Sequence, residues 1–203
     1  MAERKTIVYP NPEVLAQAVA ARTLLTIIDL LSEPDRQRVD IAVTGGTDGI
    51  YVLKVMGESP LADAVDWRRV HVWWGDERFV AADDDDRNAK QAREAWFGKL
   101  IEDGLMPAGN IHEMPADGRD ADEIASASPE QTDAVLAAAA AEYQRELVEQ
   151  LGSEPALDIA MFGVGPDAHF ASLFPDHGEA EIDDPHVLVA GVRDSPKPPP
   201  LRV

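Results

Sequence analysis

Two residues in the C-terminal part of the sequence combine a histidine with a nearby carboxylate and could carry acid–base chemistry. His169 follows Asp167 by two residues, and both come after the turn Gly163-Val164-Gly165-Pro166. Histidine has an ordinary pKa near neutrality, so it can act as a general base whose ring a carboxylate orients. The same two residues could instead cap a helix that begins near Phe170. The pair alone does not decide between these interpretations.

The position of this pair along the chain favours a ligand site. The apolar run 159–162 has the composition of a short buried strand, and two glycines and a proline end it. In an open α/β sheet, ligands bind in the crevice at the carboxyl ends of the strands. We therefore expect the pair at the edge of a sheet where a ligand can reach it.

A second candidate is the glycine-rich run T-G-G-T-D-G at 44–49. It follows a predicted strand at 39–43 and leads into an apolar segment, 50–56, that we expect to be helical. A strand, a glycine-rich turn and a helix direct backbone N–H groups toward an anion, and the threonine hydroxyls of the turn could bind phosphate oxygens. The run is neither a Walker A loop nor a dinucleotide-binding G-x-G-x-x-G motif.

A third candidate is a charged cluster after the predicted strand 70–74. It contains Asp76, Glu77 and Arg78. By itself such a cluster could be a solvated loop with a local ion pair. Four consecutive aspartates follow at 83–86, but consecutive residues cannot converge on one cation as the spaced ligands of a calcium loop do. We predict a solvated loop there and no metal site.

The order of the remaining elements predicts an α/β fold, with a mostly parallel sheet and helices on both faces. Further strands are expected at 6–9 and 187–192. Helices are expected at 12–31, from a cap at Asn88 to about residue 100, and after the capping box that begins at Ser128, with a long surface connection at 105–124. The three candidate loops would then meet at one edge of the sheet, as a phosphate subsite beside an acid–base pair.

Composition sets outer limits on the function. The 203 residues suit a single α/β domain, and their 45% hydrophobic and 28% charged content is ordinary for a soluble protein. The net charge of -20 argues against nucleic acid and anionic membranes as partners, and we see no apolar run long enough to cross a membrane. The absence of cysteine excludes a disulfide scaffold and thiolate metal sites. We expect a cytoplasmic protein that is a monomer or a weak homo-oligomer.

Four motifs, in this order, resemble those of the 6-phosphogluconolactonases, whose superfamily also holds the glucosamine-6-phosphate deaminases. They are T-G-G-T-D-G at 44–49, W-G-D-E-R-F-V at 74–80, G-V-G-P-D-A-H-F-A-S-L-F-P at 163–175 and D-S-P-K-P-P-P at 194–200. The resemblance implies a Rossmann-like fold and hydrolysis of 6-phospho-D-glucono-1,5-lactone to 6-phosphogluconate, a step of the oxidative pentose phosphate pathway. It implies no cofactor and no metal.

Residue by residue, the resemblance implies that His169 activates water and that Asp167 orients it. Arg78 and Lys197 would hold the substrate phosphate. Further contacts implied by the same motifs are the phosphate-binding residues Gly45, Gly46 and Thr47 and the possible substrate contacts Thr44, Asp76 and Glu77.

The sequence departs from the family pattern at three places. Ala168 stands where the family usually has glycine, which would strain the backbone if φ is positive there. Thr47-Asp48-Gly49 replaces the usual Ser-Thr-Pro. The family also continues beyond Val203 through a further strand and helical segments, so we expect a chain that is incomplete at its C-terminus.

Two other functions remain open on the same fold. A sugar-phosphate deaminase or isomerase would carry a glutamate where Phe174 stands and a tyrosine where Arg78 stands. A non-catalytic sugar-phosphate-binding protein would have no need of the histidine base, which this chain retains.

Overall fold

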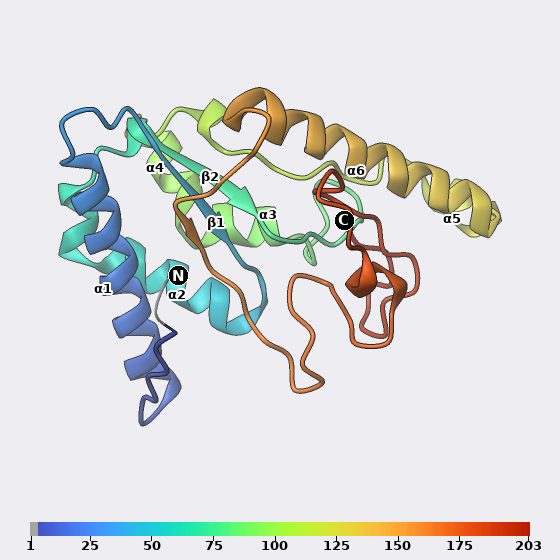
Figure 1. The fold of residues 1–203 in the computed structure, drawn as a ribbon, viewed down its shortest axis with the longest axis horizontal. Helices are drawn as coiled ribbons and strands as arrows, with labels where there is room; N and C mark the ends of the chain where they lie inside the picture. The colour runs from blue at the N-terminus through green and yellow to red at the C-terminus, as the bar shows by residue number, and fades with distance from the viewer. Residues whose placement is uncertain (1–3) are drawn as a thin grey trace.

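The computed structural model describes residues 4–203 (Figure 1). Its sheet has three parallel strands in the order β2-β1-β3, formed by β1 (Val39–Val43), β2 (Val70–Trp74) and β3 (Ile159–Ala160). The helices are α1 (Pro12–Leu31), α2 (Gly46–Glu58), α3 (Asn88–Ala92), α4 (Gly98–Glu102), α5 (Ala121–Ser126) and α6 (Pro129–Leu151). Short 3-10 turns lie at Pro60–Ala64, Trp67–Arg69, Ala108–Asn110 and Gly178–Glu181, and a π-helical turn at Arg93–Phe97 joins α3 to α4. The predicted parallel α/β fold is confirmed.

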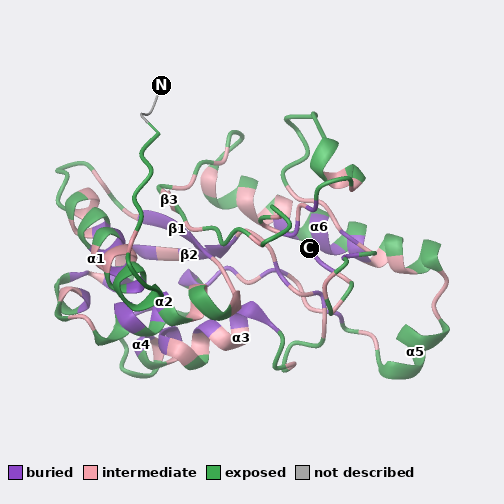
Figure 2. Cartoon of the chain, turned by 90° about the horizontal axis from the view of Figure 1, so that it is seen from below, coloured by how far each residue is buried: buried purple, intermediate pink, exposed green. Residues whose placement is uncertain are grey.

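Helices pack on both sides of the sheet. Figure 1 shows α1 and α2 on one side of the strands and α6 on the other. On the α6 side, the ring of Tyr143 lies 6.0 Å from that of Trp73, and its hydroxyl accepts a hydrogen bond from the Trp74 N–H at 3.0 Å. Figure 2 shows that buried residues concentrate on the strands and on the helix faces turned toward them. The sheet is therefore the centre of the core.

Helix α1 corrects the expectation that no segment could cross a membrane. With 20 residues and a mean hydropathy of 1.7, it is long and apolar enough to do so. In the structure its buried residues, among them Ala20, Leu24 and Ile27, belong to the core shared with α2 and the sheet. Exposed apolar residues such as Val14 and Leu25 add to the hydropathy of this helix.

Two predicted strands are absent from the described residues. The run 6–9 is mostly exposed and forms no strand, and of 187–192 only Val192 pairs, in an isolated antiparallel bridge with Arg202. Both runs have strand-like composition. A strand also needs backbone pairing with a neighbour, and among the described residues these runs pair with no strand of the sheet.

The segment 105–124 is not simply a surface connection. Ile111 forms a parallel bridge with Val72, and the His112 N–H donates to the Val72 carbonyl at 2.8 Å. Asn110 and Asp117 are also buried. The glycine, proline and aspartate content of the segment predicts a surface loop. The contacts could not be predicted, because each is made by a single residue and leaves no periodic pattern in the sequence.

Helix caps were predicted correctly where the cap is local. The hydroxyl of Ser128 accepts from the Gln131 N–H at 3.3 Å, and the Gln131 side chain accepts from the Ser128 N–H at 2.8 Å, which confirms the capping box of α6. Asn88, however, is the first residue of α3 rather than its cap, and the acceptor for its N–H comes from the distant Glu77.

Candidate active site

The three candidate loops converge at the carboxyl edge of the sheet, around an open cavity of about 390 Å³. The first loop follows β1, the second follows β2 and the third follows β3. The sequence-predicted residues that line the cavity are Thr44, Gly45, Gly46, Thr47, Asp76, Arg78, His169 and Lys197. Loops more than 100 residues apart in sequence therefore share one site.

His169 and Asp167 form the expected pair. Nδ1 of His169 is hydrogen-bonded to Oδ1 of Asp167, and this bond lowers the pKa of Asp167 to about 2, so its carboxylate is ionised at neutral pH. When Nδ1 carries the proton of this bond, Nε2 of the neutral ring holds a lone pair. The pair therefore has the arrangement of a general base and its orienting carboxylate.

Close packing fixes the position of the His169 ring. A Cβ atom on Gly165 would lie 2.1 Å from Cε1 of His169, so only glycine fits at this point of the turn. On its other side the ring stacks on the buried Phe174, with 4.6 Å between ring centroids. The Gly165 N–H also donates to the His169 carbonyl at 2.8 Å.

The backbone between the two paired residues is strained. Ala168 has φ 67°, in the left-handed region that favours glycine. We expected alanine to strain the backbone here if φ is positive, and φ is positive. The cost of this conformation is about 1–2 kcal/mol. His169 nevertheless reaches Asp167, so the substitution leaves the pair intact.

The first loop supplies a helix N-terminus. Gly46 has φ 76° and begins α2, which has 13 residues, and Gly45 at the N-cap position provides no side-chain acceptor. The first N–H groups of a helix have no partner within it and carry partial positive charge. An anionic group in the cavity can accept hydrogen bonds from them.

Cationic side chains approach the same cavity. Nζ of Lys197 lies 3.5 Å from Oδ2 of Asp167, next to the acid–base pair. Nη1 of Arg78 donates to the Asp86 carbonyl at 2.8 Å, while its Nε is buried without a hydrogen-bond partner among the described residues. Both cations are thus held at the cavity by contacts to the surrounding loops.

The structure does not bring Glu77 into the cavity. Its side chain is buried and accepts from the N–H groups of Arg78, Asn88 and Ala89 at 2.7–2.9 Å, with Nη2 of Arg87 at 4.0 Å. Burial raises the pKa of Glu77 in spite of these contacts. It therefore supports the start of α3 instead of contacting a ligand.

Sequence reasoning assigned no site role to several other residues that line the cavity, among them Asn88, Ser172, Phe174 and Arg202. Arg202 is buried and donates to the carbonyls of Lys197, Pro198 and Pro199, so it holds the loop that carries Lys197. Burial and the nearby Arg78 lower the pKa of Arg202. The signal in the sequence that could have identified Arg202 is the rarity of cations, since the chain has only 18 Lys and Arg but 38 Asp and Glu.

Fold and site together define an α/β protein that can bind an anionic ligand at a helix N-terminus, beside a histidine–aspartate pair. The family described as Glucosamine-6-phosphate isomerases/6-phosphogluconolactonase matches residues 10–203. The chain belongs to this family, which confirms the resemblance seen in the four motifs.

Individual relatives agree with this assignment. The chain is 37% identical over 202 residues to a 6-phosphogluconolactonase of Streptomyces coelicolor, covering 97% of this chain and 70% of that one. It is 36% identical over 196 residues to a 6-phosphogluconolactonase of Mycobacterium tuberculosis, covering 97% and 72%. The solved 6-phosphogluconolactonase from Trypanosoma cruzi superposes with a TM-score of 0.76 at 26% identity, covering 98% and 73%.

Proposed function

We propose that this chain hydrolyses 6-phospho-D-glucono-1,5-lactone to 6-phosphogluconate, with His169 as the general base. The observation that carries the proposal is the cavity in which His169, bonded to Asp167, lies beside the N-terminus of α2 and the cations Arg78 and Lys197. The 37% identity to a protein named 6-phosphogluconolactonase supports the choice of substrate.

Binding begins with the phosphate. Its oxygens accept hydrogen bonds from the first N–H groups of α2 and from the hydroxyl of Thr47, and Arg78 and Lys197 supply positive charge. In a chain of net charge -20, this local concentration of donors is what attracts an anionic substrate.

Hydrolysis then needs one activated water. Nε2 of His169 takes a proton from the water while its oxygen attacks the lactone carbonyl, and Asp167 stabilises the imidazolium that forms. When the tetrahedral intermediate collapses, the C–O bond of the ring breaks and the ring oxygen takes the proton back from His169. A δ-lactone is an activated ester, so its hydrolysis requires no covalent intermediate. General-base catalysis contributes about 10²–10⁴-fold to the rate.

Two further features support a lactonase rather than a deaminase. Phe174, at the position where the deaminase motif supplies a glutamate, is buried against the His169 ring. Arg78 occupies the position of the deaminase tyrosine and lines the cavity.

We place the reaction in the oxidative pentose phosphate pathway and in the cytoplasm, because a phosphorylated sugar does not cross a bilayer unaided.

The test is turnover of freshly generated lactone, corrected for its spontaneous hydrolysis. The parent chain should hydrolyse it, and Arg78→Ala should raise KM by roughly 10-fold or more, because one charge-assisted hydrogen bond to phosphate is worth about 1.5–3 kcal/mol. Arg145→Ala is the matched control, since Arg145 is an exposed cation on α6. If Arg78→Ala bound 6-phosphogluconate as tightly as the parent in calorimetry, its role at the phosphate would be refuted.

A further inference from the structure

Backbone strain is concentrated beside the cavity. Within residues 4–203, the non-glycine residues with positive φ are Ala168, Ala171, Ser172 and Asp176, all in one stretch of nine residues. Residues held in sparsely populated conformations tend to cluster at functional sites, where the surrounding structure over-determines them. Ala168 lies between the paired Asp167 and His169, but the two adjacent strained residues, Ala171 and Ser172, have no role in the proposed hydrolysis.

These two residues form a tight turn. The Leu173 N–H donates to the Phe170 carbonyl at 2.8 Å, and the Phe170 N–H donates back at 3.4 Å. The two central residues have φ 47° and 54°, the pattern of a type I′ turn. Such turns favour glycine or asparagine at both central positions. Alanine and serine are unfavourable there, so another interaction must hold the turn in this form.

The side chain of Ser172 provides that interaction. It is only 5% exposed, and its hydroxyl donates to Oδ2 of Asp76 at 2.6 Å. Asp76 follows β2 while Ser172 follows β3, so the bond joins two loops that are 96 residues apart in sequence. Both residues line the cavity. The strained turn therefore brings a buried hydroxyl to a carboxylate of the site.

We propose that Ser172 is a positioning residue that orients Asp76 for recognition of the sugar hydroxyl groups. Its hydrogen bond occupies Oδ2 and fixes the carboxylate plane, which leaves Oδ1 to accept from a hydroxyl of the ligand. Lactone and product carry several hydroxyl groups along the carbon chain, and the cations and the α2 N-terminus bind only the phosphate. The inference rests on the proposed function. It adds an account of how the protein recognises the part of the ligand that carries the hydroxyl groups.

The experiment compares two ligands. 6-Phosphogluconate carries the phosphate and the hydroxyl groups, whereas n-butyl phosphate carries the phosphate alone. Ser172→Ala and Ser172→Gly should each weaken binding of 6-phosphogluconate by roughly 10-fold or more, the loss expected for a hydrogen bond to a charged group. Neither should change the affinity for n-butyl phosphate.

Control variants separate positioning from folding. Ser172→Gly removes the backbone strain and Ser172→Ala keeps it, so equal losses of affinity would assign the effect to the hydroxyl. Ala171→Gly relaxes the same turn with the hydroxyl in place and should bind both ligands like the parent. Adding Ser172→Ala to Asp76→Asn should cause no further loss, because the two residues act as one unit.

The outcomes distinguish this proposal from the hydrolysis. Unchanged 6-phosphogluconate affinity in both Ser172 variants, or equal weakening of both ligands, would overturn the role of Ser172. If the Ser172 variants show the selective binding loss but the parent chain shows no turnover, the lactonase activity would be refuted and the Ser172 assignment supported. A parent that binds neither ligand would overturn both.

Discussion

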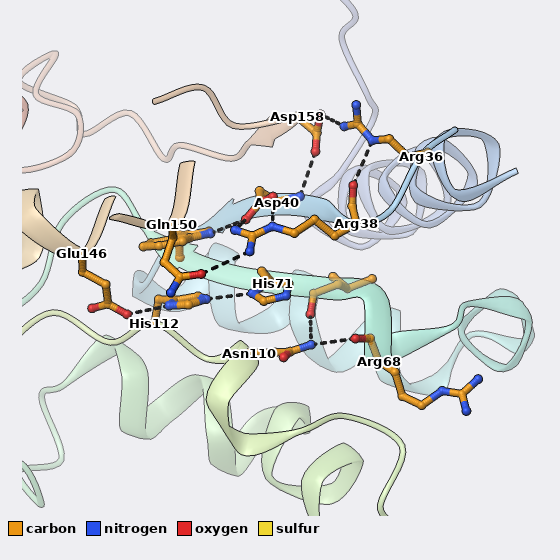
Figure 3. A network of polar contacts seen from close by, with 12 residues as sticks. Arg36, Arg38, Asp40, Arg68, His71, Asn110, His112, Glu146, Gln150 and Asp158 are labelled. Atoms are coloured by element: carbon orange, nitrogen blue, oxygen red, sulfur yellow. Dashed lines mark hydrogen bonds and ion pairs between the residues drawn. The ribbon is translucent and has the colours of Figure 1, made fainter. Parts of the chain in front are cut away.

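Two histidine–carboxylate pairs in this chain are bonded alike but lie in opposite surroundings. Nδ1 of His112 lies 2.6 Å from Oε1 of Glu146, just as Nδ1 of His169 bonds Asp167. His112 is 4% exposed, and its Nε2 lies 2.9 Å from Nδ1 of His71 (Figure 3). Both ring nitrogens of His112 are therefore engaged within the protein, while His169 lines a cavity.

The surroundings of His112 form a polar network next to the sheet (Figure 3). Its ring stacks on Trp73 at 3.8 Å, and the Trp73 indole N–H donates to Asp40 at 2.9 Å. Arg38 also donates to both oxygens of Asp40. Such a network satisfies buried polar groups and stabilises the fold. The comparison teaches that a histidine–carboxylate pair can act on a ligand or water only when a ring nitrogen remains available to it.

The largest effect should come from removing the base of the cavity pair. His169→Asn should lower kcat by about 10²–10⁴-fold, the contribution of general-base catalysis. Binding of 6-phosphogluconate should be nearly unchanged, because the phosphate contacts are separate from the ring. Steady-state turnover and calorimetry measure the two quantities. Near-parental kcat in this variant would show that another residue is the base, and Asp76 would be the first residue to test.

The opposite result is expected for the network pair. His112→Asn should lower the free energy of unfolding by about 1–3 kcal/mol, because it removes the hydrogen bonds of the buried His112 ring. Its kcat should stay at the parental value when expressed per folded molecule. Urea denaturation and turnover on the same preparation give both numbers. A rate loss without a stability loss would show that the network takes part in catalysis, and the distinction drawn above would fail.

A smaller effect tests the strain beside His169. Ala168→Gly should raise the free energy of unfolding by about 1 kcal/mol, since glycine adopts φ 67° without the steric penalty of alanine. Turnover should remain at least parental. Ala180→Gly serves as the control, because Ala180 is exposed in a 3-10 turn and is not among the residues with positive φ, so the same change should not stabilise it. Equal shifts in both variants would argue against strain at Ala168.

A further effect is a pH dependence of stability at the network. Burial, with Arg38 and His112 nearby, lowers the pKa of His71 to about 4, from 6.5, and Asp40 only partly opposes this. Below about pH 6.5 the unfolded chain binds the proton first, so the free energy of unfolding falls as the pH drops toward 4. His71→Gln should flatten this slope, and the exposed His186→Gln should not. Denaturation midpoints between pH 4 and 7 test it, and an unchanged slope in His71→Gln would assign the effect elsewhere.

Local patterns were enough to predict much of the fold. The strands 39–43 and 70–74 were correct because mostly apolar runs of that length, ended by turn residues, are buried in parallel sheets. The start of α6 was correct because its capping box satisfies the backbone with neighbouring residues. Asn88 was wrongly taken for a cap because the real acceptor, Glu77, comes from another loop.

The same division applies to the site. The sequence by itself determined the residue types of the three loops and their positions after strands, and with them the candidates His169, Asp167 and Arg78. Lys197 was a candidate only through the family resemblance of the motif at 194–200. Only the tertiary structure decided that Glu77 turns into the core, that Arg202 supports the Lys197 loop and that Ser172 reaches Asp76. Motifs and caps depend on residues a few positions apart. These three contacts depend on how distant loops pack at one edge of the sheet, and no local pattern records that packing.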